Sequence, residues 1–172
     1  MDNVQIIDNF FDADNYEKIK EIIFNACWVK NLIERDIYYG KKDPPYWTIT
    51  LTDFPFFSVI LKNIIEETFN KKFKLIRVYA LSQYYEENGS FHIDNIKDTR
   101  FTFCLYINPD IPSDPHGTFL IRIPNINHIM SIEPISNRGV LFPANYRHKG
   151  NSFNRDVNSL RICITWKMDE IK

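Results

Sequence analysis

Hydrophobic positions in the first part of the chain recur with the spacing of helices. Val4–Ile7 is a short apolar run typical of a strand. One apolar stripe follows it at Tyr16, Ile19, Ile22, Ile23, Ala26 and Cys27, and a second lies at Phe57, Ile60, Leu61, Ile64 and Ile65. Both stripes predict one-sided helices, the second spanning about residues 55–70. Asp14 with Glu17 resembles an acidic capping box at the start of the first helix.

The pattern changes after the second predicted helix. Residues 34–47 are polar, aromatic and interrupted by proline, which favours a flexible loop or ribbon. Short runs rich in Val, Ile, Phe, Tyr and Thr then alternate with turn residues. They are Leu75–Tyr85, Phe91–Asp94, Phe101–Asn108, Thr118–Ile123, Met130–Ile132, Val140–Phe142 and Leu160–Trp166. Regular short strands after two helices predict an α+β chain, mainly β, whose body is an antiparallel sandwich or barrel.

Two of these strands, 101–108 and 160–166, carry different residue types on their two faces. One face of each holds bulky apolar side chains, because strand side chains alternate. The other face holds Thr102, Cys104 and Tyr106 on the first strand and Arg161, Cys163 and Thr165 on the second. Small residues beside one long polar group are typical of a barrel wall that faces helices outward and a ligand cavity inward. The alternative for either strand alone is a sandwich strand with a solvated polar face.

Composition narrows the class of protein. The 172 residues are 44% hydrophobic and 15% aromatic, enough for the core of one globular domain and too apolar for a disordered chain. We expect a single domain over 1–172, with a strand and helices in 1–72 and the β-body in 73–168. Lys+Arg number 21 and Asp+Glu 22, so the net charge of −1 disfavours nucleic acid or a membrane surface as a partner.

The sequence also favours a cytoplasmic protein. The chain shows neither a signal-peptide pattern nor an apolar run long enough to cross a bilayer. Its three cysteines are odd in number and far apart, with no C-x-x-C pair. We therefore expect reduced, buried thiols rather than a disulfide framework.

Candidate metal ligands lie in two separate segments. In extended chain His92 and Asp94 point to the same face, so a nitrogen and an oxygen can converge on one metal ion. This H-x-D spacing alone is common by chance, and such pairs are more often surface residues. His148 adds a second imidazole, and two imidazoles with one carboxylate are typical of non-haem Fe(II) oxygenases. Arg161, among small neighbours, is suited to a two-pronged grip on a carboxylate.

The order of His92-x-Asp94, His148 and Arg161 resembles that of the Fe(II)/2-oxoglutarate-dependent dioxygenases, most closely the prolyl-4-hydroxylase-like branch. Five further stretches resemble that branch in order: 6–23, 84–95, 100–108, 116–119 and 132–142. The resemblance therefore covers nearly the whole chain and is weakest over 30–75. It implies a double-stranded β-helix (jelly roll, cupin-like) with the N-terminal helices packed on one sheet.

The resemblance also implies the roles of particular residues. His92, Asp94 and His148 bind Fe(II) and thereby form the catalytic centre, while 2-oxoglutarate and O2 are cosubstrates. Arg161 and Tyr106 hold the far carboxylate of 2-oxoglutarate, and Tyr84 is a further cosubstrate candidate. An aspartate at position 94, rather than Ala or Gly, disfavours the halogenating relatives. The implied activity is hydroxylation of a C–H bond, with a protein or peptide prolyl side chain as the expected target and with release of succinate and CO2.

Four residues are candidates for substrate contact: Asn95, Arg147, Tyr46 and Trp47. The first two flank the proposed ligands, and the aromatic pair lies in the segment 34–47, where related enzymes carry a mobile cover over the substrate. Exposed loop residues and simple aromatic packing explain them equally well. His116 and His128 lie in segments rich in turn residues, where histidines are usually exposed, and we expect structural or surface roles for both.

Three alternatives remain open for the function. A small-molecule oxygenase of the same superfamily fits the same residues. A nucleic-acid oxygenase fits them too, although the near-neutral charge counts modestly against it. A non-catalytic, cupin-like metal-binding protein would need the ligands but has no need of Arg161.

Overall fold

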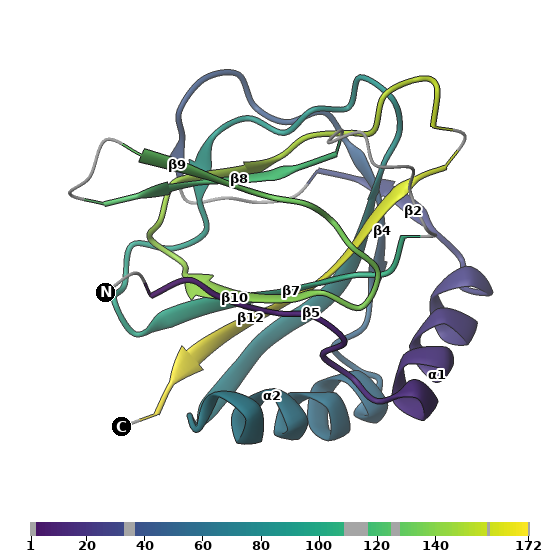
Figure 1. Ribbon diagram of the computed structural model, residues 1–172, viewed down its shortest axis with the longest axis vertical. Helices are drawn as coiled ribbons and strands as arrows, with labels where there is room; N and C mark the ends of the chain where they lie inside the picture. Colours follow the sequence, from purple (N-terminus) through teal and green to yellow (C-terminus); the bar gives the residue numbers. More distant parts are fainter. Residues whose placement is uncertain (1–2, 33–36, 109–116, 125–127, 158, 172) are drawn as a thin grey trace.

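The structure is a computed structural model that describes residues 3–32, 37–108, 117–124, 128–157 and 159–171. Two antiparallel sheets face each other across its centre (Figure 1). The larger sheet has the order β1 (Gln5–Ile7), β10 (Gly139–Pro143), β7 (Arg100–Tyr106), β12 (Arg161–Glu170), β5 (Phe73–Gln83), β4 (Tyr46–Thr50) and β2 (Val29–Asn31). The smaller sheet has the order β3 (Ile37–Tyr38), β6 (His92–Ile93), β11 (His148–Gly150), β8 (Phe119–Ile123) and β9 (His128–Ile132). This arrangement confirms the predicted mainly-β jelly roll.

Helices cover the outer face of the larger sheet, as predicted (Figure 1). They are α1 (Ala13–Phe24), a π-helical segment η1 (Phe56–Leu61) and α2 (Lys62–Phe69), which continues η1. The cap of α1 is Asp12 rather than the expected Asp14, because Asp12 precedes the helix and its carboxylate accepts the Asn15 N–H at 2.9 Å. No helix of the described chain is long and apolar enough to cross a membrane.

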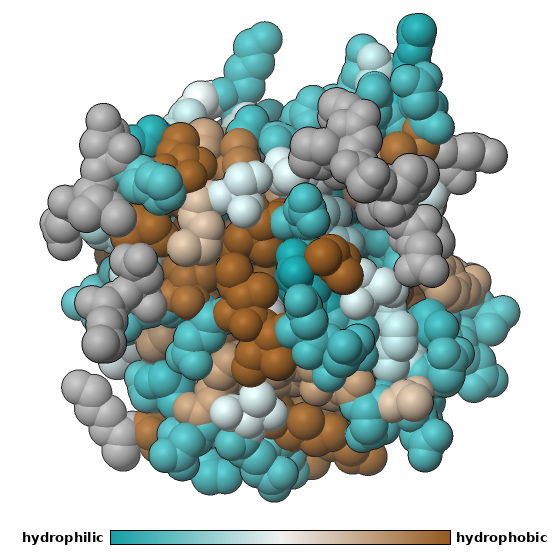
Figure 2. Space-filling view, viewed as in Figure 1, coloured by the Kyte–Doolittle hydropathy of each residue, from teal (hydrophilic) through white to brown (hydrophobic). Residues whose placement is uncertain are grey.

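The two faces of β7 and β12 separate the core from the cavity. Phe103, Leu105 and Trp166 are fully buried on the helix side, where the Trp166 Nε1–H donates to the Phe57 carbonyl at 2.9 Å. A second apolar cluster fills part of the space between the sheets. In the space-filling view apolar side chains form a band across the middle of the molecule, and polar residues cover most of the edges (Figure 2). The alternation predicted for these two strands is confirmed.

The described part of the segment 34–47, for which a flexible loop or ribbon was expected, contains strand residues. Within its described part, β3 pairs with β6 and β4 pairs with β5, so the chain joins both sheets there. Prolines at 44 and 45 interrupt the sequence pattern, but the run that follows them alternates as a strand should and pairs with β5. The N-terminal part therefore supplies β1, β2 and β4 to the larger sheet as well as the helices.

The cysteines are all free thiols, but they are not all buried. Cys104 and Cys163 are buried as expected, whereas Cys27 is exposed. The apolar stripe was predicted to run through Cys27, but α1 ends at Phe24. Cys27 therefore lies beyond the helix and not on its buried face.

A buried carboxylate joins α2 to the start of β5. Glu66 is 6% exposed and accepts hydrogen bonds from the Phe73 N–H at 2.6 Å and from Lys62 Nζ at 2.7 Å. Burial raises the pKa of Glu66, but these bonds and the charges of Lys62 and Lys72 bring it below its ordinary value of 4.5. Glu66 is therefore ionised in the folded protein at neutral pH and stabilises it.

We expect Glu66→Gln to lower the free energy of unfolding at pH 7 by about 1.5–3 kcal/mol, since it weakens charge-assisted hydrogen bonds. The pKa is lowered in the folded state, so this difference from wild type is complete above about pH 4.5 and shrinks as the pH falls further. Urea denaturation at pH 7 and pH 3.5 measures both quantities. The exposed neighbour is the matched control: Glu67→Gln should change stability little at either pH.

Candidate metal and cosubstrate site

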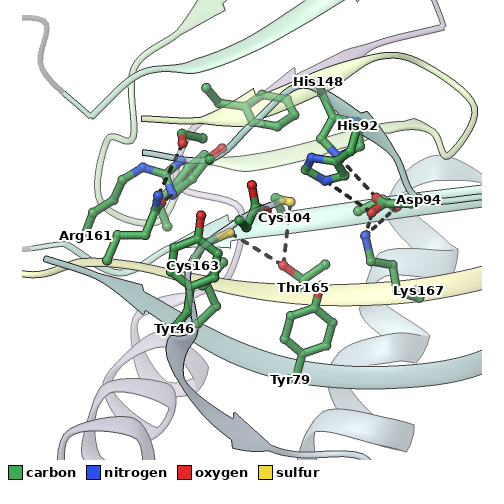
Figure 3. Close-up of a pocket in the computed structure, with 18 residues that line it drawn as sticks. Tyr46, Tyr79, His92, Asp94, Cys104, His148, Arg161, Cys163, Thr165 and Lys167 are labelled. Carbon is green, nitrogen blue, oxygen red and sulfur yellow. Dashed lines mark hydrogen bonds and ion pairs between the residues drawn. The ribbon is translucent and has the colours of Figure 1, made fainter. Parts of the chain in front are cut away.

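A cavity of about 50 Å³ lies between the two sheets. Five strands contribute most of its wall: β5, β7, β8, β11 and β12. The polar and charged side chains that line it include Asp43, Tyr46, Tyr79, Gln83, His92, Asp94, Thr102, Tyr106, His148, Arg161, Thr165 and Lys167. Cys104, Cys163 and Thr165 form a floor of small side chains in the middle, so the space above them stays open (Figure 3).

The three predicted metal ligands meet at one end of the cavity. His92 on β6 and His148 on β11 are direct partners across the strands, and their rings lie 4.4 Å apart. Asp94 follows β6, with Oδ1 3.7 Å from His92 Nε2 and Oδ2 3.3 Å from His148 Nε2. One nitrogen or oxygen from each residue lies within 4.8 Å of the others. Two nitrogens and one oxygen at this spacing can bind one divalent transition-metal ion.

Backbone carbonyls orient both imidazoles. The Nδ1 atoms of His92 and His148 lie 2.7 Å from the carbonyl oxygens of Ser90 and Tyr146, respectively. Since a carbonyl only accepts hydrogen bonds, each Nδ1 carries a proton, and each Nε2 is turned toward Asp94. Fixing the tautomer through the second ring nitrogen is typical of metal-ligating histidines.

Asp94 is held as an anion. Its side chain is 4% exposed, its Oδ2 accepts the Thr102 hydroxyl at 2.8 Å, and Lys167 Nζ forms an ion pair with the same oxygen. Burial raises the pKa of Asp94, but Lys167 and the two imidazoles hold it well below its ordinary value. The carboxylate is therefore ready to bind a cation without first losing a proton.

Arg161 lies at the opposite end of the cavity (Figure 3). It is 2% exposed, and its guanidinium donates to the Gly117 carbonyl and to Gln83 Oε1, each at 2.7 Å. Among the described residues none of the ion pairs includes Arg161. A Cβ added at Gly150 would lie 3.1 Å from its Nη1, so glycine makes room for the guanidinium. A buried cation with two neutral partners is suited to an anionic ligand.

Tyr106 provides a second donor at this end of the cavity. Its ring lies 5.2 Å from the Arg161 guanidinium, and its buried hydroxyl has no hydrogen-bond partner among the described residues. Burial raises the pKa of Tyr106 well above its ordinary value, so the phenol keeps its proton and can donate it. An orphaned buried hydroxyl next to an uncompensated guanidinium fits a carboxylate that both would bind.

These features together fit the Fe(II) and 2-oxoglutarate that the sequence resemblance implies. The carboxylate and two imidazoles could hold the metal, and Arg161 with Tyr106 could hold the far carboxylate of the cosubstrate. The side chains between the two ends, Cys104, Cys163 and Thr165, are small and leave room for the rest of the cosubstrate.

The remaining sequence candidates divide between the cavity and the surface. Tyr46 lines the cavity and is 1% exposed, whereas Trp47, the next residue on β4, points the other way, toward Lys30. Arg147 lies outside the cavity wall, with its guanidinium 3.7 Å from the centroid of the Tyr39 ring. Asn95 Oδ1 accepts the backbone N–H of Lys97 in a turn and does not line the cavity.

Tyr84, the further cosubstrate candidate, does not line this cavity. It follows the last residue of β5 and is 50% exposed, with its N–H bonded to Glu87 in a turn. Because strand side chains alternate, the preceding residue Gln83 points inward instead and contacts Arg161. His128 is exposed, as expected, and His116 lies outside the described residues.

Sequence reasoning missed Gln83 and Lys167. Both line the cavity, and the alternation along β5 and β12 could have found them. Lys167 was missed because the predicted strand ended at Trp166, whereas β12 continues to Glu170.

This chain is similar to known proteins in its structure. No protein-family model matches the chain. No curated protein matches it by sequence.

Solved structures similar to this one cover almost the whole chain. A Trichoplax adhaerens prolyl hydroxylase, solved with a peptide fragment of the hypoxia-inducible factor oxygen degradation domain, has a TM-score of 0.74 at 18% identity, covering 99% of this chain and 84% of that one. A Pseudomonas putida prolyl-4-hydroxylase has a TM-score of 0.68 at 13% identity, covering 100% and 95%. HygX from Streptomyces hygroscopicus, solved with nickel and 2-oxoglutarate, has a TM-score of 0.69 at 11% identity, covering 98% and 83%. The chain therefore has the jelly-roll fold found in prolyl hydroxylases and other 2-oxoglutarate- and Fe(II)-dependent oxygenases.

Proposed function

We propose that this protein is a non-haem Fe(II)- and 2-oxoglutarate-dependent dioxygenase that hydroxylates a C–H bond. One observation carries the proposal. The cluster of His92, Asp94 and His148 lies at one end of a cavity, and at its other end lies the buried Arg161, which forms no ion pair with any acid of the described chain. A metal-binding protein without turnover would need the cluster alone. The distant guanidinium argues for a second, carboxylate-bearing ligand in the same cavity.

The chain's own residues would bind, orient and shield the reacting groups. Bound Fe(II), with 2-oxoglutarate and O2, would supply the oxidising chemistry that converts C–H to C–OH and 2-oxoglutarate to succinate and CO2. His92 and His148 present Nε2 because their Nδ1 protons are held by backbone carbonyls. Arg161 and Tyr106 would orient the cosubstrate from the other end of the cavity. The burial of these residues between the two sheets would limit the access of water to the reacting groups.

A prolyl side chain in a protein or peptide is the proposed target. The support is the sequence resemblance to the prolyl-4-hydroxylase-like branch and the similarity in fold to two prolyl hydroxylases. A net charge of −1 favours a peptide or small molecule over nucleic acid as substrate. A small-molecule substrate is the second candidate, because proteins that share one fold can differ widely in the loops that decide substrate specificity.

The activity can be tested with purified protein. Under anaerobic conditions, Fe(II) and 2-oxoglutarate together should produce a visible charge-transfer absorption band that neither gives alone. In air, the same mixture should slowly release succinate without any substrate, and a screen of proline-containing peptides should find a mass gain of one oxygen atom. A protein that shows neither the band nor succinate release is not this enzyme.

A further inference from the structure

The two carboxylate oxygens of Asp94 have different surroundings. Oδ2 accepts the Thr102 hydroxyl at 2.8 Å and forms the ion pair with Lys167 Nζ, which also donates to Thr102 Oγ1 at 3.3 Å. His148 Nε2 lies 3.3 Å from the same oxygen, while Oδ1 faces His92 Nε2 at 3.7 Å. A carboxylate oxygen has about two lone-pair sites, so Thr102 and Lys167 together occupy those of Oδ2. Oδ1 is therefore the oxygen left for a metal ion.

The pairing of β12 with β7 fixes this arrangement. Lys167 and Thr102 are direct partners across the two strands, and both side chains line the cavity. The Lys167 side chain is 12% exposed and that of Asp94 is 4% exposed, so little water reaches the ion pair. Figure 3 shows the Lys167 ammonium pointing at Asp94, at the end of the cavity away from Arg161. Within the described chain Lys167 has no polar partner besides Asp94 and Thr102, so its charge acts on the metal ligand.

Lys167 changes the charge that a bound metal ion would meet. Among the three ligand residues Asp94 alone is anionic, because imidazoles bind metals in their neutral form, and Lys167 cancels that charge. The other acid that lines the cavity, Asp43, accepts the Ser90 N–H at 2.6 Å and is not a partner of Lys167. The repulsion between the ammonium and a bound ion grows in proportion to the charge of the ion, and it is strong where water is largely excluded. A trivalent ion is therefore disfavoured more than a divalent one.

We propose that Lys167 is a positioning residue that confines a bound metal ion to Oδ1 of Asp94 and makes the site favour Fe(II) over Fe(III). This inference rests on the proposed function, because it concerns the same metal site. The proposed reaction uses the ferrous ion, so a site with this preference keeps the iron in the reactive oxidation state between turnovers. Thr102 shares in holding Oδ2 but contributes no charge.

The preference between oxidation states is measured on protein loaded with iron, without 2-oxoglutarate or substrate. Redox mediators fix a series of potentials, and the electron paramagnetic resonance signal of Fe(III) gives the ratio of Fe(III) to Fe(II) in the protein at each. Lys167→Met removes the charge from a side chain of similar length, and it should raise this ratio at least about tenfold at any one potential. Lys167→Gln keeps an N–H donor but also lacks the charge, so it should raise the ratio by a similar factor. Lys167→Arg should stay close to wild type.

Two further variants separate the charge of Lys167 from its hydrogen bonds. Thr102→Val removes a donor to Oδ2 without changing the charge, so it should weaken Mn(II) binding about tenfold and leave the Fe(III)/Fe(II) ratio unchanged. Lys74→Met removes an exposed lysine from β5, in the same sheet but outside the cavity wall, and should leave both quantities unchanged.

The confinement of the metal to Oδ1 is measured with Co(II), whose visible absorption spectrum depends on the number and geometry of its ligand atoms. Lys167→Met frees Oδ2 for the metal, so its Co(II) spectrum should differ from that of wild type. Lys167→Arg keeps the ion pair and should give the wild-type spectrum.

Two outcomes overturn the inference while leaving the proposed function in place. One is a wild-type Fe(III)/Fe(II) ratio in Lys167→Met and Lys167→Gln, which would limit Lys167 to balancing Asp94 in the metal-free protein. The other is a wild-type Co(II) spectrum in Lys167→Met. If the methionine variant does not fold, Lys167→Gln alone decides both comparisons. Failure of wild type to bind Mn(II) and Fe(II) contradicts the proposed metal site itself.

Discussion

Replacing His148 by alanine is expected to weaken metal binding more than about 100-fold, because loss of a hydrogen-bond partner behind a ligand already costs 10–100-fold. His148 contributes one of the three atoms that lie within 4.8 Å of one another, and the remaining His92 and Asp94 cannot enclose a metal ion from the same sides. The dissociation constant for Mn(II), measured by electron paramagnetic resonance, gives the loss directly. The visible band with Fe(II) and 2-oxoglutarate should disappear, together with succinate release.

His128 provides the matched control for this variant. It is exposed on β9, at the edge of the smaller sheet, so His128→Ala should keep both the band and the affinity for Mn(II). Circular dichroism and thermal unfolding should show that His148→Ala still folds, because the backbone pairing of β11 with β6 and β8 does not need the side chain. An unchanged absorption band in folded His148→Ala would exclude this residue as a ligand.

Replacing Arg161 by methionine is expected to reduce the affinity for 2-oxoglutarate by two to three orders of magnitude. Removing one partner of a buried charge pair typically costs about 3–5 kcal/mol, because the other charge is then buried without compensation. Arg161 is 2% exposed, so water cannot replace the guanidinium. Calorimetric titration of Mn(II)-loaded protein with 2-oxoglutarate measures the loss. The rise in melting temperature that 2-oxoglutarate causes in wild type should also be lost.

Two further variants serve as comparisons for the Arg161 variant. Arg155→Met removes an exposed arginine from the nearby loop and should bind 2-oxoglutarate like wild type. Tyr106→Phe removes one hydroxyl donor without changing the charge, and its loss should be smaller, about 1–3 kcal/mol. The Arg161 assignment is wrong if its methionine variant binds the cosubstrate as tightly as the Arg155 variant does.

The alternation of small and bulky residues was the most informative pattern in the sequence. It separated the helix side of β7 and β12 from the cavity side, and the structure confirms this division at the cavity-lining positions within 101–108 and 160–166. The same pattern failed where the ends of strands were uncertain. The predicted strand 75–85 extended two residues beyond β5, whose last residue, Gln83, lines the cavity, whereas Tyr84 follows the strand and is half exposed.

The substrate candidates show the limit of arguments from proximity in sequence. Arg147 and Asn95 are adjacent to metal ligands, yet neither lines the cavity, because an adjacent side chain in a strand or turn points elsewhere. Lys167 is far from Asp94 in sequence, but the two side chains form an ion pair. Pairing of β12 with β7 brings Lys167 opposite Thr102, which itself bonds to Asp94.

The sequence by itself determined which side chains could carry chemistry and the order in which they occur. Residue type and strand alternation, together with the resemblance to the prolyl-4-hydroxylase-like branch, singled out His92, Asp94, His148, Tyr106 and Arg161 without a structure. Only the tertiary structure decided their distances, the backbone carbonyls that orient the imidazoles, and the cation beside Asp94. Those features arise from the register between strands that are distant in sequence, and register depends on how the whole sheet packs.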